Sequence, residues 1–237
     1  MKMLLILLLF STILSDEISD KVQRLNNSSK YSAKKRTLVI MCEMFLRKGY
    51  PTSFTAGILG NIVHESSVGK FESSNYHDES KKPQYLKYMD DLYSYRTKYS
   101  SKIVTDVSMR ELTRLMEKLR ADNWKKGKFG LGCFQWMGGK SYSLVQHYNK
   151  QCNNRDKITL DEAIRAEANM IIQEFSSSYK YYYNQWENAN PNKDSISAAY
   201  NAGLIINDIL NPPGPVGYRD ISRGNTAKDI YNILIGK

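Results

Sequence analysis

Cysteine and histidine are scarce in this chain, and their scarcity excludes several kinds of catalytic site. Among 237 residues there are three cysteines (Cys42, Cys133 and Cys152) and three histidines. The cysteine spacings are not those of a metal site, and no cysteine-protease signature surrounds any of them. We therefore expect no metal and no cofactor. Outside the cell two of the cysteines could form a disulfide, and the sequence leaves open which two would pair.

Long apolar runs are also lacking, apart from one at the N-terminus. There, Lys2 precedes a mostly apolar run, and the small residue Ser15 stands before Asp16. This arrangement is typical of a secretory signal peptide over residues 1–15, which is too short for a stable membrane span. A signal anchor is the alternative. We expect a soluble mature protein that is secreted, either extracellular or in the lumen of the secretory or endolysosomal pathway.

The positive charge of the chain does not come with a nucleic-acid-binding motif. The formal net charge is +10, of which Lys2 in the expected signal peptide contributes one. The basic residues are scattered, with small clusters at 34–36, 81–82 and 125–126. Such a surface favours an anionic partner, for example a bacterial wall polymer, without identifying it. We expect a monomer that binds no nucleic acid and does not insert stably into a membrane.

Helical periodicity accounts for most of the remaining chain. Residues 16–30 are polar, contain two overlapping glycosylation sequons and are expected to form a leader before a single domain over residues 31–237. Apolar residues at three- and four-residue steps predict that this domain is mainly α-helical. The stretch 67–105 lacks a period and predicts a small irregular or β insertion. The predicted helices cover residues 31–48, 54–66, 107–119, 141–151, 161–188, 195–210 and 223–235. We expect Asp106 or Ser108 to cap the third helix and a kink at the serines 176–178 in the fifth. The last helix is expected to face inward through Ala227, Ile230, Tyr231 and Leu234.

One acid, Glu65, stands at the end of an apolar helical stripe. Ile58, Ile62 and Glu65 are spaced so that they share one face of the predicted helix 54–66. An acid in this place is expected to be partly desolvated, which disfavours its charged form and suits proton donation. Gly57 and Gly60 lower helix stability, so we expect them to permit close approach by another element. The alternative is an ordinary surface glutamate in a last helical turn.

Two further stretches combine small residues with polar or aromatic side chains. Residues 130–136 read Gly-Leu-Gly-Cys-Phe-Gln-Trp, and glycine lets a ligand or a facing helix approach the backbone closely. Their spacing and the lack of a preceding strand do not match a dinucleotide-binding fingerprint. Residues 198–203 read Ala-Ala-Tyr-Asn-Ala-Gly and fall within a predicted helix. Neither stretch identifies a function by itself.

In chain order, the stretches 60–67, 130–136 and 198–203 resemble the lysozyme-like superfamily. The first is similar to the Glu-Ser helix end of goose-type lysozymes and lytic transglycosylases, the second to their Gly-Leu-Met-Gln element, and the third to their Ala-Tyr-Asn-Ala-Gly signature. A closer match overall is the phage tail-lysozyme family, which shares a Gly-x-Gly-x-x-Gln-Trp-x-Gly segment and an Arg-x-x-x-Ala-x-x-x-Tyr ending. The resemblance spans about residues 38–236. It implies an α+β lysozyme-like fold, a helical bundle around a central helix.

The resemblance also implies roles for four residues. Glu65 would be the general acid that protonates the leaving glycosidic oxygen. Gln135 and Trp136 would bind the sugar by hydrogen bonding and by stacking, and Tyr200 would orient Glu65 or stabilise developing charge. Core packing is the alternative for Trp136, and a buried helical tyrosine is the alternative for Tyr200. No second carboxylate is identified, and the candidates lie in the irregular region: Glu72, Asp78, Glu79 and Asp90.

The implied activity is that of a muramidase, a glycosidase that cleaves the β-1,4 MurNAc–GlcNAc strand of bacterial peptidoglycan. Without a second carboxylate, the sugar's own hydroxyl could attack instead of water and give an anhydro product, which is lytic transglycosylase chemistry. A wall-binding module without catalysis is the other main alternative, and chitin specificity also stays open. The sequence does not distinguish a bacteriolytic, antimicrobial role in defence from feeding or competition.

Overall fold

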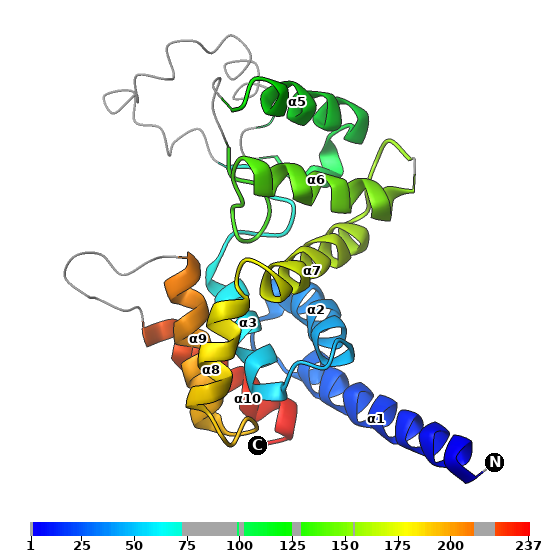
Figure 1. Ribbon diagram of the computed structural model, residues 1–237, viewed down its shortest axis with the longest axis vertical. Coiled ribbons are helices and arrows are strands. Elements are labelled where there is room, and N and C mark those ends of the chain that lie inside the picture. The colour runs from blue at the N-terminus through cyan, green and yellow to red at the C-terminus, as the bar shows by residue number, and fades with distance from the viewer. Residues whose placement is uncertain (1, 73–98, 100–101, 125–128, 154, 211–220) are drawn as a thin grey trace. The chain divides into compact units, whose positions relative to one another are not determined.

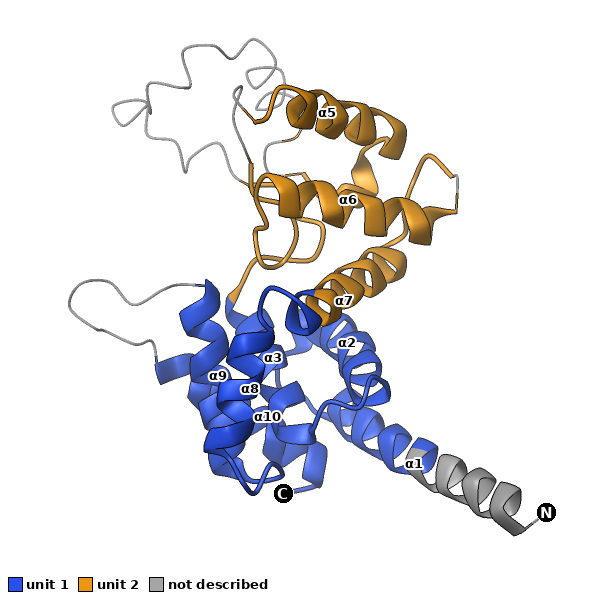
Figure 2. Cartoon of the chain, in the orientation of Figure 1, with its two compact units in different colours: residues 1–64, 174–237 blue, residues 65–173 orange. Residues whose placement is uncertain are grey.

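The computed structural model describes residues 2–72, 99, 102–124, 129–153, 155–210 and 221–237, and their regular structure is helical (Figure 1). The prediction of a mainly α-helical fold is thereby confirmed. The chain divides into two compact units, one of residues 1–64 with 174–237 and one of residues 65–173 (Figure 2). The elements are α1 (Lys2–Asn27), η1 (Ser32–Lys34), α2 (Lys35–Arg47), α3 (Thr52–His64), η5 (Val104–Asp106), α5 (Met109–Ala121), α6 (Gly139–Cys152), α7 (Leu160–Ser176), α8 (Lys180–Ala189), α9 (Ile196–Leu210) and α10 (Ile221–Ile235).

Helix α3 is the central helix of unit 1. Every residue from Thr52 to Ile62 is buried, as expected for a helix that is covered on all sides. The helix packs against α2, α9 and α10 (Figure 1). At its N-terminal end, the Phe54 ring lies 5.1 Å from the ring of Phe175 and 4.8 Å from that of Trp186, measured between centroids. The expected bundle around a central helix is therefore present in unit 1.

Two glycines of α3 allow the neighbouring helices to approach its backbone. A Cβ atom on Gly57 would lie 2.4 Å from the Cβ of Ala202 in α9. A Cβ atom on Gly60 would lie 2.9 Å from the backbone nitrogen of Ala227 in α10. Both distances are too short for real atoms, so only glycine fits at these positions. The close approach expected from the sequence is confirmed.

We expect Gly60→Ala to lower the free energy of unfolding by about 1–3 kcal/mol, the usual cost of overpacking a core. The added methyl group would meet backbone atoms of α10. Backbone atoms cannot relieve the clash by rotating about a side-chain bond, as a flexible side chain could. Thermal unfolding followed by circular dichroism measures the loss. Gly139→Ala is the matched control, because a Cβ atom there meets nothing within 4 Å. Equal melting temperatures for the two variants would contradict the packing argument.

A buried polar group joins the same three helices. The side-chain nitrogen of Asn61 in α3 donates to the carbonyl of Gly57, at 3.0 Å, and to that of Gly203 in α9, at 2.9 Å. Its side-chain oxygen accepts a hydrogen bond of 3.2 Å from Nη1 of Arg223 in α10. Asn61 has no exposed surface and Arg223 is buried. Since buried polar groups cost free energy unless they are hydrogen-bonded, this arrangement fixes how α3, α9 and α10 pack.

The predicted helix 161–188 is two helices, α7 and α8. The backbone leaves the α-helical pattern between Ser176 and Lys180, where the N–H of Tyr179 donates to the carbonyl of Glu174 at 2.7 Å. Three consecutive serines occupy this place, and serine favours helix ends over interiors because its hydroxyl competes for backbone hydrogen bonds. The kink foreseen at the serines is thus a complete break.

Residues 16–30, expected to be a polar leader, are mostly helical and packed. Residues 16–27 belong to α1, which contacts α2 and α10. Ile18 and Leu25 lie seven residues apart on one face of α1, and both are buried. The start of the domain at residue 31 stays a prediction. With Val22 between them, Ile18 and Leu25 form a single narrow apolar stripe among polar residues.

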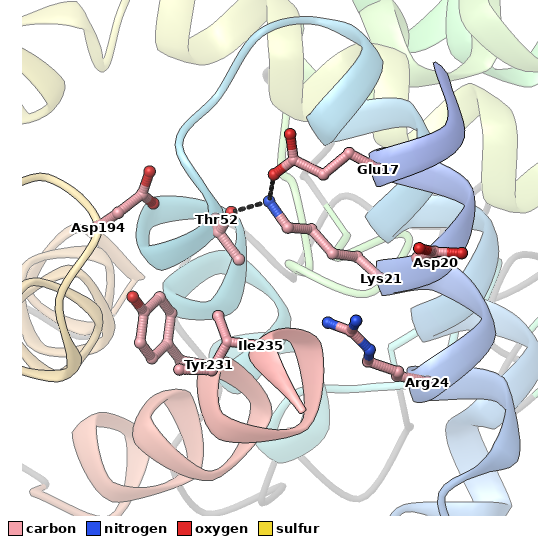
Figure 3. A pocket seen from close by; sticks show the side chains of 8 residues that line it. All are labelled: Glu17, Asp20, Lys21, Arg24, Thr52, Asp194, Tyr231 and Ile235. Atoms are coloured by element: carbon pink, nitrogen blue, oxygen red, sulfur yellow. Dashed lines mark hydrogen bonds and ion pairs between the residues drawn. The ribbon is translucent and has the colours of Figure 1, made fainter. Parts of the chain in front are cut away.

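Two cations of α1 bind the ends of other helices in unit 1. Lys21 donates to the hydroxyl of Thr52, at 2.9 Å, and lies 2.6 Å from Glu17 (Figure 3). Arg24 donates to the carbonyl of Leu234, at 2.9 Å, near the C-terminal end of α10. Cations are favourable there because the last carbonyls of a helix lack helical partners. These side chains border a pocket of about 310 Å³ that is lined by Glu17, Asp20, Lys21, Arg24, Thr52, Asp194, Tyr231 and Ile235.

Unit 2 contains α5 and α6, which pack on each other, and most of α7. Ser108 caps α5 by accepting from the N–H of Glu111, at 3.2 Å, as one of the two predicted caps. Isolated β-bridges among the described residues connect Lys70 with Ile103, Phe71 with Leu131, and Leu131 with Trp136. No helix of the described part is long and apolar enough to cross a membrane.

The three cysteines are buried thiols, and none is in a disulfide. Burial raises the pKa of Cys42 to about 12. At pH 8 only about one Cys42 side chain in 10⁴ would be the reactive thiolate. We expect the native protein to react with iodoacetamide at Cys42 at least 10³-fold more slowly than the urea-unfolded protein, as read by mass spectrometry. Rapid labelling of Cys42 in the native state would show that its pocket is open to solvent.

Candidate active site

Glu65 lies directly after the last residue of α3, and it is the first residue of unit 2. The predicted helix ended near Ser66, whereas the helix in the structure ends at His64. Ile58 and Ile62 are fully buried, and Glu65 is partly exposed. The acid thus follows a buried helix and remains accessible from solvent.

The last turn of α3 is held by side chains from other elements of unit 1. Lys34, at the end of η1, donates to the carbonyl of Ile62 at 2.7 Å, which satisfies one of the C-terminal carbonyls of the helix. Nε2 of His64 lies 2.8 Å from the hydroxyl oxygen of Thr226 in α10. The backbone that leads into Glu65 therefore has a defined position in unit 1.

On the other side of Glu65, the segment 66–72 is bound to the loop 130–136. The N–H of Gly132 donates to the carbonyl of Lys70, at 3.0 Å. The N–H of Glu72 donates to the carbonyl of Gly130 at 2.9 Å, and the N–H of Gly130 donates to the Glu72 carboxylate at 2.8 Å. The structure thus joins the segment that follows Glu65, through Lys70 and Glu72, to the stretch 130–136 within unit 2.

Gln135 and Trp136 both serve this pairing. The side-chain nitrogen of Gln135 donates to the carbonyls of Gly132, at 2.8 Å, and Lys70, at 3.2 Å. Whether its side-chain oxygen accepts from a sugar hydroxyl or amide stays a prediction. Trp136 is 3% exposed and its ring lies 5.4 Å from that of Phe134, so core packing is its main role in this conformation. Stacking of Trp136 on a sugar stays a prediction.

Glu167 of α7 is a buried carboxylate that binds both the segment 66–72 and the loop 130–136. Its Oε1 accepts from the N–H of Gly69 at 2.6 Å and from the hydroxyl of Tyr148 at 2.5 Å, and its Oε2 accepts from the N–H of Cys133 at 2.8 Å. The side chain has no exposed surface. Burial raises the pKa of Glu167, and hydrogen bonds from Cys133, Tyr148 and Gly69 act in the opposite direction.

Glu167 did not emerge from the sequence as a functional candidate. It carried the same signal as Glu65, an acid in an apolar stripe, because Ile164 and Ile171 lie on its face of the helix and are buried. Its three N–H and O–H donors come from distant parts of the chain. Two of them are backbone groups, which have no signature in the sequence.

Tyr200 belongs to unit 1, as does the third stretch, 198–203. Its ring packs on Gly224, where a Cβ atom would lie 2.7 Å from the ring, and Nζ of Lys228 lies 5.7 Å from the ring centroid. Tyr200 is half-buried and borders a surface pocket of about 380 Å³ with Ile196, Ser197, Asn201 and Lys228. Whether Tyr200 acts on Glu65 stays a prediction.

Of the four candidates for a second carboxylate, only Glu72 is among the described residues. Glu72 lies on the segment that follows Glu65, and its carboxylate accepts from the N–H of Gly130. The other three candidates, Asp78, Glu79 and Asp90, lie outside the described residues. In the part of the chain that the structure describes, no three His, Cys, Asp or Glu side chains gather so that they could hold a metal ion.

The mainly helical structure, with a central buried helix in unit 1, is consistent with a lysozyme-like fold. The family model described as phage tail lysozyme matches residues 36–234, and the chain belongs to this family. Membership supports a lysozyme-like, cell-wall-degrading glycosidase function in general terms, with peptidoglycan as the substrate. No curated protein and no solved structure matches the chain.

Proposed function

We propose that the protein is a secreted muramidase that cleaves the β-1,4 bond between MurNAc and GlcNAc in peptidoglycan, with Glu65 as the general acid. The observation that carries this proposal is the attachment of the backbone on both sides of an accessible Glu65. Lys34 binds the helix end before it, at Ile62, and Glu167 binds the segment after it, at Gly69. A general acid must stay within hydrogen-bond reach of the oxygen that it protonates, so such attachment favours this role.

In the proposed reaction, a proton passes from the Glu65 carboxyl group to the glycosidic oxygen. The bond between that oxygen and C1 breaks, and the leaving sugar departs as an alcohol. A water oxygen then adds to C1, one proton of that water returns to the Glu65 carboxylate, and a new reducing end forms. The side-chain oxygen of Gln135 supports binding of a hydroxyl or amide group of the glycan, since its nitrogen is committed to two carbonyls.

The second candidate reaction is that of a lytic transglycosylase on the same bond. Here the C6 hydroxyl of the MurNAc residue attacks C1, its proton returns to the protein, and a 1,6-anhydro end forms. The hydrogen bonding of Glu72 favours this second reaction. Glu72 is the one candidate for a second carboxylate among the described residues, and its carboxylate is already hydrogen-bonded to the backbone of Gly130. A carboxylate with that bond is less free to act as a nucleophile or base.

The net charge of +10 supports a wall-bound substrate. Peptidoglycan layers that carry anionic polymers attract a basic protein, and this attraction weakens as salt is added. We propose secretion because residues 1–15 resemble a signal peptide. We propose a monomer on the basis of the sequence alone.

The test is to incubate purified protein that begins at Asp16 with a suspension of purified peptidoglycan. We expect the turbidity to fall and soluble fragments to appear. Mass spectra of the fragments distinguish the two reactions, because reducing ends show hydrolysis and 1,6-anhydro ends show transglycosylation. A protein that sediments with the wall but releases nothing would be a binding module, and the proposal would be wrong.

A further inference from the structure

The Glu167 carboxylate connects three parts of unit 2 that are far apart in the sequence. Gly69 lies four residues after Glu65, Cys133 lies two residues before Gln135, and Tyr148 is in α6. Each donates a hydrogen bond to Glu167, at 2.6, 2.8 and 2.5 Å respectively. The two backbone donors use different oxygens of the carboxylate, so both oxygens are needed.

The surroundings of Glu167 leave no room for another arrangement. Gly132 has a φ of +81°, which favours glycine, and a Cβ atom there would lie 3.0 Å from Oε1 of Glu167. A buried carboxylate is costly unless its oxygens accept hydrogen bonds, and it would not be retained for packing alone when an apolar side chain would fill the space. The carboxylate therefore has a specific task, which is to bind the N–H groups of two loops.

We propose that Glu167 is a positioning residue of the active site, which fastens the segment beginning at Glu65 to the loop that carries Gln135. This inference rests on the proposed function, because it assigns Glu65 and Gln135 to one glycan-cleaving site. Glu167 itself is fully buried and touches no substrate. It acts by fixing Gly69 and Cys133, and through them the residues on either side.

The test is Glu167→Gln. Glutamine has the same shape but only one acceptor oxygen, so one of the two backbone N–H groups would face an NH₂ group. We expect kcat on soluble peptidoglycan fragments to fall about 10–100-fold, as for a small misplacement of catalytic groups, with KM within about three-fold of the wild type. Amide hydrogen exchange should rise at least about ten-fold in residues 66–72 and 129–137 and stay unchanged in α3 and α5.

Two further variants separate positioning from general damage. Glu117→Gln makes the same charge change at an exposed position of α5 in the same unit, and we expect wild-type kinetics and exchange. Tyr148→Phe removes one donor but keeps both backbone hydrogen bonds, and we expect kcat to fall less than about three-fold. A loss in Tyr148→Phe equal to that in Glu167→Gln would overturn the proposal, since the backbone contacts would then not matter.

Unchanged exchange in both segments of Glu167→Gln, or an unchanged kcat, would also overturn the inference. The exchange measurement needs no catalysis, so it decides whether Glu167 fastens the two segments even in an inactive protein. A wild-type protein that cleaves no peptidoglycan would overturn the proposed function and the catalytic part of this inference together. Increased exchange in such a protein would still support the fastening itself.

Discussion

Glu65→Gln is expected to slow peptidoglycan clearing by about 10²–10⁴-fold, the range that general acid catalysis contributes. Glutamine keeps the size and polarity of the side chain but has no acidic proton to give to the glycosidic oxygen. Because Glu65 is partly exposed and follows the end of α3, we expect the unfolding free energy to change by no more than about 0.5 kcal/mol. The measurement is the initial rate of turbidity loss, beside a thermal unfolding curve.

The matched control for Glu65 is again Glu117→Gln, which removes one negative charge from an exposed helix position. It corrects for the weaker or stronger wall adsorption that a change in net charge causes. We expect its clearing rate to stay within about two-fold of the wild type. Full clearing by Glu65→Gln would show that another group protonates the leaving oxygen, and the mechanism proposed for this protein would be wrong.

Asn61→Leu is expected to lower the free energy of unfolding by about 2–4 kcal/mol, which is the largest stability effect that we expect. Leucine has the same branching and is larger than asparagine, so the loss does not come from a cavity. It comes from the carbonyl of Gly203, which loses its donor, and from the Arg223 guanidinium, which loses the acceptor at Nη1. Urea unfolding followed by circular dichroism gives the free energy, and the slope of the transition shows whether it remains cooperative.

Asn225→Leu makes the same replacement at an exposed position of α10 and serves as the control. We expect its unfolding free energy to stay within about 0.5 kcal/mol of the wild type. If the two leucine variants unfolded at the same urea concentration, the buried contacts of Asn61 would contribute nothing, and the packing of α3, α9 and α10 would depend on apolar surface alone.

The sequence predicted the helices well because their signals are local. The predicted helix 223–235 corresponds to α10, and its four expected inward residues, Ala227, Ile230, Tyr231 and Leu234, are all buried. Likewise Ser108 could be named as a cap from its position before an apolar periodic stretch. The ends of elements differ by a few residues, as expected when tertiary contacts decide where a helix stops, and the helix over residues 16–27 was not predicted.

The roles of the residues in the motifs that resemble lysozyme-like proteins could be predicted only in part. The motif residues Gly60, Asn61, Gly203 and Arg223 hold three helices together, whereas Glu65 is the residue of the first motif for which we propose a chemical role. A sequence motif records that residues are required together, and it does not say whether they pack or react. Partners more than a hundred residues apart, such as Asn61 and Arg223, have no spacing from which their contact could be inferred.

Unit 1 is built from both ends of the chain, and this determines when it can fold. Helix α3 buries every residue from Thr52 to Ile62 largely against α9 and α10, which follow more than 130 residues later. Residues 65–173 form a continuous stretch and can fold while the chain is still being synthesised. Apart from α2, the helices that cover the apolar surface of α3 are missing until α9 and α10 have been made. Between those two moments α3 depends on chaperones, or on its own solubility, to escape aggregation.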